Sequence, residues 1–241
     1  MVDRVCLEVC VDSVAGLTAA IDGGADRIEL CSALSEGGLT PSAGLMHLAS
    51  KTPVPCYAMI RPRGGDFVFS TAECSVMEQD IAQVRAAGLA GVVLGAATSR
   101  DQLDLSVLSK LCHAAIGLGM TLHRVVDMLD DPVSAVQQAK SLGFERILTS
   151  GGAPSAPQGQ AVITRMVRQA GRALSIMPGG GVSPDGVFDL LRQTGAREVH
   201  ASCRNATKEG TPHPIFGAVS GITNQTTVSM MRHQIDQISE R

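Results

Sequence analysis

The sequence predicts an α/β fold, a single (β/α)8 TIM barrel with an extra C-terminal helix, which occupies residues 1–241 as one domain. Eight short apolar segments alternate with stretches of helical periodicity along the whole chain, and strands that alternate with helices form a parallel sheet. Several segments carry a polar residue at every second position, whereas the central strands of an open doubly wound sheet are almost continuously apolar. A chain of 241 residues without a linker or a change of composition suits one closed barrel.

Each predicted strand is a short run rich in β-branched and other apolar residues. The eight runs are residues 5–10, 27–31, 56–61, 91–94, 121–124, 146–149, 174–177 and 198–202. In a barrel of this kind the functional residues lie at the C-terminal ends of the strands, so the residues that end these runs are the candidates for function.

Between the strands, apolar residues recur at the spacing of one helix face. The recurring sets are Val14, Leu17 and Ile21; Met77, Ile81 and Val84; Val133, Val136 and Ala139; and Ile163, Met166 and Ala170. A last amphipathic helix, which is expected to close the barrel, carries Val228, Met231, Ile235 and Ile238.

Capping residues support the helix boundaries. Ser70 is expected to open one helix, and the pairs Thr40-Pro41, Asp131-Pro132 and Ser183-Pro184 read as an N-cap followed by proline at the first helical position. Glycine suits the left-handed position just after a helix, and four predicted helices end at Gly24, Gly88, Gly143 and Gly195.

The composition excludes several classes of function. A net charge of −3 and an aromatic content of 2% argue against a nucleic-acid partner, which needs a basic surface and rings for base stacking. No apolar run reaches the roughly 18 residues that would cross a membrane. The N-terminus lacks the apolar core of a signal peptide, so we expect a cytoplasmic protein whose seven cysteines are reduced thiols.

The first two strands place four chemically active side chains on the inward face. Strict alternation turns Glu8 and Cys10 of the first strand, and Glu29 and Cys31 of the second, into the barrel. The strands are neighbours, so we expect Glu8 beside Glu29 and Cys10 beside Cys31. Two inward thiolates suit Cu(I), which prefers sulfur ligands, although a buried cysteine pair can also serve as plain apolar packing. Cys203 is a further candidate ligand just after the eighth strand.

A second set of strand-end residues suits an anion. Glycine-rich turns expose backbone N–H groups, and arginine binds carboxylate or phosphate through two parallel hydrogen bonds. A small phosphorylated or carboxylated metabolite is therefore a possible ligand, although the glycines can equally make tight turns. The candidate residues are Arg61, Arg63, Ser150, Gly151, Gly152, Gly179, Gly180, Gly181 and His200.

A third reading is acid–base catalysis. Glu8, Glu29, His123 and Asp127 are the candidates, because paired carboxylates and histidines near a cavity can move protons at neutral pH. The alternative is a structural network in which Arg61 and Arg124 neutralise the two glutamates. No lysine ends a strand, which argues against a Schiff-base aldolase. Whether the protein is an enzyme stays open at this point.

The same segments resemble the copper homeostasis protein CutC family. The matching stretches are CVDSVAGLTAAIDGGADRIELCSALSEGGLTPS at 10–42, MIRPRGGDFVFS at 59–70, TLHRVVDMLDDP at 121–132, ERILTSGG at 145–152, IMPGGGV at 176–182 and, more weakly, EVHASCR at 198–204. The resemblance implies a (β/α)8 barrel, a cytoplasmic location, homo-oligomers, and copper binding and trafficking. The suggested copper-binding cysteines of the family fall on Cys10 and Cys31.

Two segments depart from the family pattern. Residues 95–104 replace a glycine-rich loop after the fourth strand, and the region after Arg204 is shorter and different. The leading expectation is a cytosolic protein that binds Cu(I) through Cys10 and Cys31 for buffering or trafficking. The alternative is a barrel enzyme or binder for a small anionic metabolite.

Overall fold

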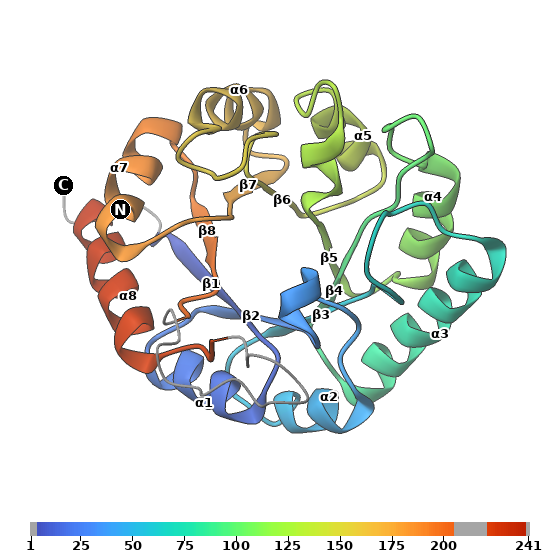
Figure 1. Ribbon diagram of the computed structural model, residues 1–241, viewed down its shortest axis with the longest axis horizontal. Helices are drawn as coiled ribbons and strands as arrows, with labels where there is room; N and C mark the ends of the chain where they lie inside the picture. The colour runs from blue at the N-terminus through green and yellow to red at the C-terminus, as the bar shows by residue number, and fades with distance from the viewer. Residues whose placement is uncertain (1–3, 205–220, 240–241) are drawn as a thin grey trace, which may run out of the picture.

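Eight parallel strands form one curled sheet in the order β7-β6-β5-β4-β3-β2-β1-β8, which makes a nearly closed barrel (Figure 1). The computed structural model describes residues 4–204 and 221–239. The strands are β1 (Cys6–Val11), β2 (Arg27–Leu30), β3 (Cys56–Met59), β4 (Gly91–Leu94), β5 (Gly119–Leu122), β6 (Arg146–Thr149), β7 (Ser175–Pro178) and β8 (Glu198–Ala201). The predicted fold class is confirmed, and β7 and β8 face each other across the remaining seam.

Two predicted strands are shorter or shifted in a way that matters for the site. β3 ends at Met59, so Arg61 lies in the turn after the strand. β5 starts at Gly119 and ends at Leu122, so His123 is the first residue beyond it and caps a short 3-10 helix, Arg124–Met128. Both side chains therefore stand above the strand ends, where ligands bind in barrels.

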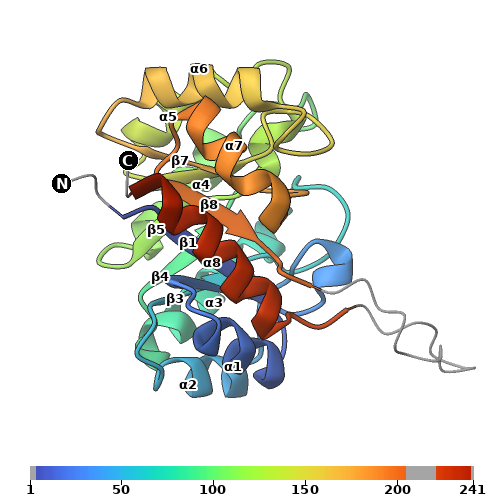
Figure 2. The same cartoon turned by 90° about the vertical axis from the view of Figure 1, so that its left-hand side faces the viewer.

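Helices surround the sheet as an outer ring. They are α1 (Val14–Asp22), α2 (Ala43–Ala49), α3 (Thr71–Ala87), α4 (Leu105–Ala114), α5 (Ala135–Ser141), α6 (Gln160–Ala170), α7 (Pro184–Thr194) and α8 (Gln225–Ser239), with a 3-10 helix over Leu34–Glu36. The C-terminal helix α8 packs against both α7 and α1, so it closes the ring as expected (Figures 1 and 2).

The predicted caps are correct at two helix starts and wrong at two others. Ser70 caps α3 and shares a reciprocal capping box with Glu73, and Ser183 precedes Pro184 at the start of α7. The N-cap of α2 is Ser42 rather than Thr40, because the Thr40 hydroxyl is instead bonded to the backbone of Arg61.

Asp131 does not cap a helix either. Its carboxylate accepts a hydrogen bond from the backbone N–H of Val133, which makes a turn, and α5 begins four residues after Asp131. The glycines predicted to follow helices all have positive φ; they are Gly24, Gly88, Gly143 and Gly195.

The predicted apolar faces of α3 and α6 are buried, but in α1 only Leu17 of the predicted residues is fully buried, and Ile21 is half-buried. The side chain of Val14 is 57% exposed, whereas Leu17 and Ala20 pack on the barrel. Val14 is the first residue of its helix, where the side chain still lies outside the groove between sheet and helix.

Apolar residues fill the space between sheet and helices, and a smaller cluster lies inside the barrel. Leu7 and Val9 belong to the outer core, while Tyr57, Met59 and Cys31 form the inner cluster with Val93. The alternation predicted for β1 and β2 is therefore correct, and it turns polar side chains inward.

The predicted register of β1 against β2 is wrong by two residues. Glu8 lies opposite Arg27, and Cys10 lies opposite Glu29. A two-residue shift keeps every side chain on its expected face, so the alternation could not reveal it. Among the described residues, no helix combines the length and the hydropathy needed to span a bilayer.

Candidate metal centre and ligand cavity

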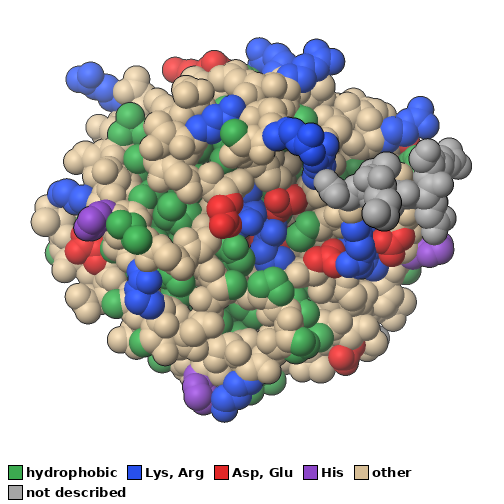
Figure 3. Space-filling model, turned by 180° about the vertical axis from the view of Figure 1, so that it is seen from behind, with side chains coloured by type: hydrophobic (Ala, Val, Ile, Leu, Met, Phe, Trp, Pro, Cys, Tyr) green, Lys and Arg blue, Asp and Glu red, His purple; other side chains and the backbone are tan. Residues whose placement is uncertain are grey.

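The lower half of the barrel interior is a network of paired charges. Arg27 is bonded to Glu8 and to Glu198, and the Arg146 Nε donates to the Glu198 carboxylate at 3.1 Å. Both guanidinium groups lie over the ring of Tyr57, at 5.6 and 4.8 Å from its centroid. The strands begin at this end, and Figure 3 shows acidic and basic side chains gathered at the centre of that face. We name these five residues the lower network.

Glu8 is the deepest member of the lower network and has no exposed surface. Burial raises the pKa of its carboxyl group, but the attraction of Arg27 and the hydrogen bond from His200 outweigh burial and lower the pKa to about 2. Glu8 is thus an ionised carboxylate, and its Oε1 holds the His200 Nδ1 at 2.8 Å.

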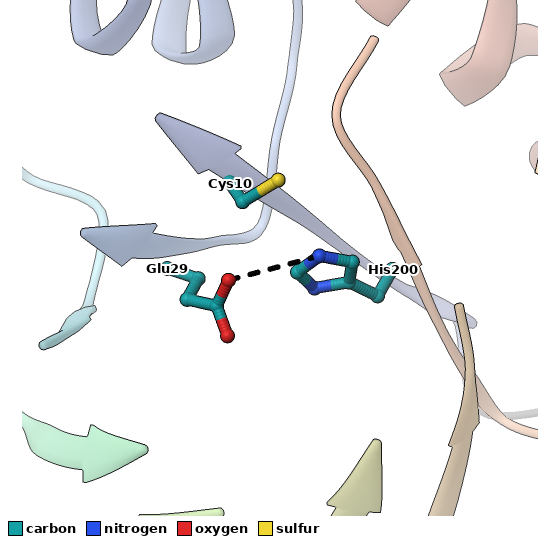
Figure 4. A group of neighbouring side chains, drawn as sticks. All are labelled: Cys10, Glu29 and His200. Atoms are coloured by element: carbon teal, nitrogen blue, oxygen red, sulfur yellow. Dashed lines mark ion pairs between the residues drawn. The ribbon is translucent and has the colours of Figure 1, made fainter. Parts of the chain in front are cut away.

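Directly above Glu8, three buried side chains from three neighbouring strands point toward one another (Figure 4). Cys10 of β1, Glu29 of β2 and His200 of β8 each bring one ligand atom to within 4.8 Å of the other two. The His200 Nε2 lies 3.8 Å from the Glu29 Oε2. We call this group the upper cluster; its sulfur, nitrogen and oxygen donors have the composition of a metal site.

The charges of the upper cluster are set by burial and by each other. Burial lowers the pKa of His200, but the neighbouring Cys10 and Glu29 raise it well above its usual value, with help from the hydrogen bond to Glu8. For Glu29, burial raises the pKa, and the charge of Glu8 adds to this effect. The carboxyl Oε1 of Glu29 has no hydrogen-bond partner among the described residues.

The second predicted copper ligand, Cys31, lies next to the upper cluster but outside it. Its thiol donates to the Glu29 Oε2 at 3.6 Å, and it is completely buried. A side chain at Gly38 would lie 3.1 Å from its sulfur, so the loop after β2 covers it closely. Cys203 is also buried, and burial together with Cys10 raises its pKa to about 12.

A cavity of about 330 Å³ opens above the upper cluster. Its volume is at the lower end of the range for small-molecule sites in proteins. Cys10, Glu29 and His200 line it from below, and residues of the turns after the strands line it from the sides. The lining from these turns includes Arg61, Phe67, His123, Arg124, Gly180, Gly181 and Arg204.

Arg61 is buried beneath two loops. Its Nη1 donates to the carbonyl of Glu36 at 2.7 Å and to that of Gly38 at 3.2 Å, and its Nη2 donates to the carbonyl of Gly65 at 2.7 Å. The Nε has no partner, and no carboxylate lies within ion-pair distance in the part of the chain that the structure describes. Burial, with Arg63, lowers the pKa of Arg61.

His123 is a buried neutral imidazole. Burial and the charge of Arg61 lower its pKa to about 3. Its Nδ1 accepts a hydrogen bond from the N–H of Val125 at 3.2 Å, so the proton of the neutral ring is on Nε2, which has no partner among the described residues. Gly95 lies against the ring, because a Cβ there would come within 2.6 Å of Nδ1.

Asp127 closes the glycine turn after β6. Its carboxylate accepts hydrogen bonds from the N–H groups of Ser150 and Gly152 and from the hydroxyl of Thr149, and it pairs with Arg124 at 2.8 Å. The Gly151 N–H donates to Thr149 Oγ1. The N–H groups of this turn, which were expected to bind an external anion, are thus already bonded within the chain.

The other predicted anion-binding residues separate into two groups. Gly180 and Gly181 line the cavity, and Gly179 lies so close to His200 that a Cβ there would be 3.1 Å from its Cβ. Arg63 lies outside the cavity, where it pairs with Glu73 at 2.5 Å and with Asp66 at 3.0 Å.

Sequence reasoning missed Phe67 and every member of the lower network except Glu8. Arg27, Arg146 and Glu198 each start a strand, and Arg27 shares the inward face of Glu29, so alternation could have found it. Glu8 is therefore neutralised by Arg27, and not by Arg61 or Arg124 as the structural alternative had it. Phe67 packs between Arg61 and His123, with 4.8 Å to each, and only its place in the loop after β3 hints at this.

Comparisons with known proteins give a consistent result. The model of the CutC family matches residues 5–205. A CutC family protein of Sinorhizobium medicae is 53% identical over 201 residues, which are 83% of this chain and 82% of that protein. A Caulobacter vibrioides CutC family protein is 50% identical over 216 residues, which are 90% of this chain and 88% of that protein.

Comparison with solved structures also finds a CutC protein. The crystal structure of a Streptococcus agalactiae CutC protein, provisionally assigned to copper homeostasis, is 30% identical with a TM-score of 0.78 and covers 82% of this chain and 98% of that one. Phosphoribosylanthranilate isomerase of Thermotoga maritima has a TM-score of 0.64 at 14% identity, over 97% of this chain and 99% of that one, and shares the fold alone.

Proposed function

This chain belongs to the CutC family, and from that premise we propose that it is a cytosolic copper homeostasis protein that binds Cu(I) at Cys10, His200 and Cys31. The observation that carries the proposal is the upper cluster, whose sulfur and nitrogen donors lie within 4.8 Å of each other in a buried position. The copper homeostasis name of the Streptococcus agalactiae relative supports the choice of ion.

The donor set favours Cu(I) over harder ions. Thiolate and imidazole are the ligands that Cu(I) selects, whereas Mg²⁺ and Ca²⁺ need a shell of oxygens that this cluster does not offer. Cys10 is the anchor in this proposal, His200 adds a nitrogen donor, and Cys31 adds a second thiolate from behind Glu29. Because both thiols must lose their protons on binding, the Glu29 carboxylate, 3.6 Å from the Cys31 sulfur, is placed to accept one.

The cavity supplies the path for the ion. Cys10 and His200 line its lower wall, so a copper donor or acceptor can reach the cluster from above without unfolding the barrel. Transfer then proceeds by exchange of thiolate ligands and needs no change of oxidation state. The homo-oligomer implied by the family resemblance is part of this proposal and can be measured by sedimentation of the reduced protein.

A Cu(I) competition titration against a chromophoric chelator tests the proposal on the reduced protein. We expect Cys10→Ser/Cys31→Ser to weaken Cu(I) binding by about 100-fold or more, since even outer partners of metal ligands change affinity by about 10- to 100-fold. Cys112→Ser is the matched control, because Cys112 is a buried thiol on α4, outside the upper cluster. An unchanged affinity in the double variant, or an equal loss in the control, would contradict the proposal.

A second function is favoured by one further observation: Glu29 lines the cavity, and its Oε1 has no hydrogen-bond partner in the described part of the chain. A buried carboxyl group with a raised pKa can act as a general acid or base on a small bound metabolite. Of the other predicted catalytic residues, Glu8 and Asp127 are held in ion pairs, and His123 faces the cavity as a neutral donor. Turnover and ligand affinity of Glu29→Gln test this role. Loss of turnover with unchanged affinity is the result expected.

A further inference from the structure

Another part of the cavity wall carries hydrogen-bond donors that no other described residue uses. Arg61 is 6% exposed and His123 is 3% exposed, and both line the cavity. Each has one buried nitrogen without a partner among the described residues, Nε of Arg61 and Nε2 of His123. Buried polar atoms in proteins are almost always bonded, so two unpartnered donors on one cavity wall indicate a ligand that accepts hydrogen bonds.

Phe67 joins the two donors into one recognition surface. The Arg61 guanidinium lies 4.8 Å from the centroid of the Phe67 ring, and the His123 ring lies 4.8 Å from the same ring. The Phe67 carbonyl is fixed by the N–H of Ala97 at 2.9 Å. The loop after β4 therefore holds this wall in place.

The charges around the cavity select the kind of anion. Arg124 is paired with Asp127 at 2.8 Å, and Arg204 is paired with Asp12 at 3.0 Å. Arg61 is the cavity arginine without a carboxylate partner among the described residues, and its neighbour His123 is uncharged. A buried cation without an ion pair among the described residues suits an anion of one negative charge better than a phosphate dianion, which carries a second negative charge.

The glycine turn after β6, which does not line the cavity, offers no anion site of its own. Its N–H groups would suit a phosphate, but the Asp127 carboxylate already accepts from Ser150 at 2.9 Å and from Gly152 at 3.0 Å. Among the buried side-chain oxygens of the described residues that line the cavity, the Glu29 Oε1 is an acceptor without a partner, and a carboxyl oxygen can accept a hydrogen bond from a hydroxyl group.

We infer that the cavity binds a small hydroxycarboxylate, with its carboxylate against the side chains of Arg61 and His123 and a hydroxyl group against the side chain of Glu29. This ligand class is independent of copper. It deepens the second proposed function, on which it rests only in the choice of cavity. If the ligand binds but is not converted, the ligand site stands and the proposed catalytic activity is contradicted.

Calorimetry on the copper-free protein tests the inference with glycerate, glycolate, acetate and inorganic phosphate as probes. We expect glycerate and glycolate to bind more tightly than acetate, and phosphate to bind most weakly. Arg61→Gln should weaken glycerate binding by about 10- to 100-fold, as is typical when a charge-assisted hydrogen bond is lost, and His123→Phe by about 3- to 10-fold.

The matched control is Arg63→Gln, in the same loop but outside the cavity, where glycerate affinity should change by less than about twofold. His123→Phe keeps an aromatic ring at this position, so its glycerate affinity tests the inference if the Arg61 variant does not fold. Three results would overturn the inference: no carboxylate binding to the wild type at millimolar concentration, phosphate binding more tightly than glycerate, or an equal loss in the Arg63 variant. Acetate binding as tightly as glycerate would overturn the hydroxyl contact with Glu29.

Discussion

The two levels of the barrel interior use the same residue types in opposite ways. In the lower network, Arg27 and Arg146 each pair with Glu198, Glu8 pairs with Arg27, and no member has an unpartnered buried atom among the described residues. In the upper half, Arg61 and Glu29 each keep one. A polar network that is fully bonded fixes one structure, whereas an incompletely bonded one marks the place where a ligand completes it.

The largest expected difference between the levels follows from deleting one arginine in each. Arg27→Met leaves the Glu8 carboxylate buried with only His200 beside it, so we expect a loss of about 3–5 kcal/mol in the free energy of unfolding. Arg61→Met leaves no carboxylate unpaired, and its cost should stay below about 2 kcal/mol, which comes from the lost bonds to backbone carbonyls. Urea denaturation of both variants measures the two losses.

Equal losses of unfolding free energy in the two variants would contradict the distinction between a fully bonded lower network and an incompletely bonded upper half of the barrel. Glu73→Gln serves as a surface reference, since its carboxylate pairs with a partly exposed Arg63.

The second expected effect is a pH dependence of stability that comes from His123 in the upper half of the barrel. The pKa of His123 is about 3 in the folded protein against 6.5 ordinarily, so the unfolded chain binds a proton below pH 6.5 while the folded ring stays neutral. The contribution of His123 to stability therefore falls as pH decreases from 6.5 toward 3, by about 2 kcal/mol between pH 6.5 and 4.5. Denaturation at several pH values should show that His123→Phe flattens this slope.

The contribution of His123 can be separated from that of Glu8 because the two groups act in different pH ranges. The lowered pKa of Glu8, about 2 against 4.5, contributes stability that is lost only as pH falls below 4.5. His47→Gln changes an exposed histidine of α2 and should keep the wild-type slope. A wild-type slope in the His123 variant would show that this ring is not the neutral buried group described above.

Much of the architecture could be predicted from the sequence, because strand alternation and glycine C-caps are local properties. The inward turn of Glu8, Cys10 and Glu29 followed from period-two alternation alone. The register of neighbouring strands could not be predicted in this way, because the stagger of a closed barrel is set by the whole sheet. This is why Glu29, and not Cys31, lies opposite Cys10.

The candidate site was predicted in its components but not in its pairing. Arg61 and His123 were identified as strand-end residues, yet only coordinates show that one is an unpaired cation and the other a neutral donor. The sequence did not indicate that the Asp127 carboxylate accepts hydrogen bonds from the N–H groups of Ser150 and Gly152. Such bonds join turns far apart in the sequence, so no local pattern reports them.

The third prediction concerns the Asp127 carboxylate. Asp127→Ala removes the acceptor of the N–H groups of Ser150 and Gly152, and we expect it to lower the free energy of unfolding by about 2 kcal/mol. Added acetate should restore part of the loss in the variant, because its carboxylate can take the vacated place. Melting temperatures with and without acetate measure the rescue against the wild type.

A different outcome would change the comparison of the two levels. Full stability of Asp127→Ala without acetate would mean that the turn after β6 holds its shape without the carboxylate, and that its N–H groups are available to an external anion.

The smallest expected effect tests how firmly the upper wall is held. Gly95→Ala places a Cβ within 2.6 Å of the His123 Nδ1, so the ring must shift, and we expect a loss of about 1 kcal/mol in the free energy of unfolding. The control is Gly44→Ala on α2, where the added Cβ meets only the Ser42 hydroxyl at 4.0 Å, and alanine should stabilise the helix by about 0.5–1 kcal/mol. Since the shift also moves the Nε2 donor, Gly95→Ala should weaken glycerate binding while Gly44→Ala leaves it unchanged. Unaltered glycerate affinity in the Gly95 variant, alongside the expected loss of stability, would separate the packing of this wall from ligand recognition.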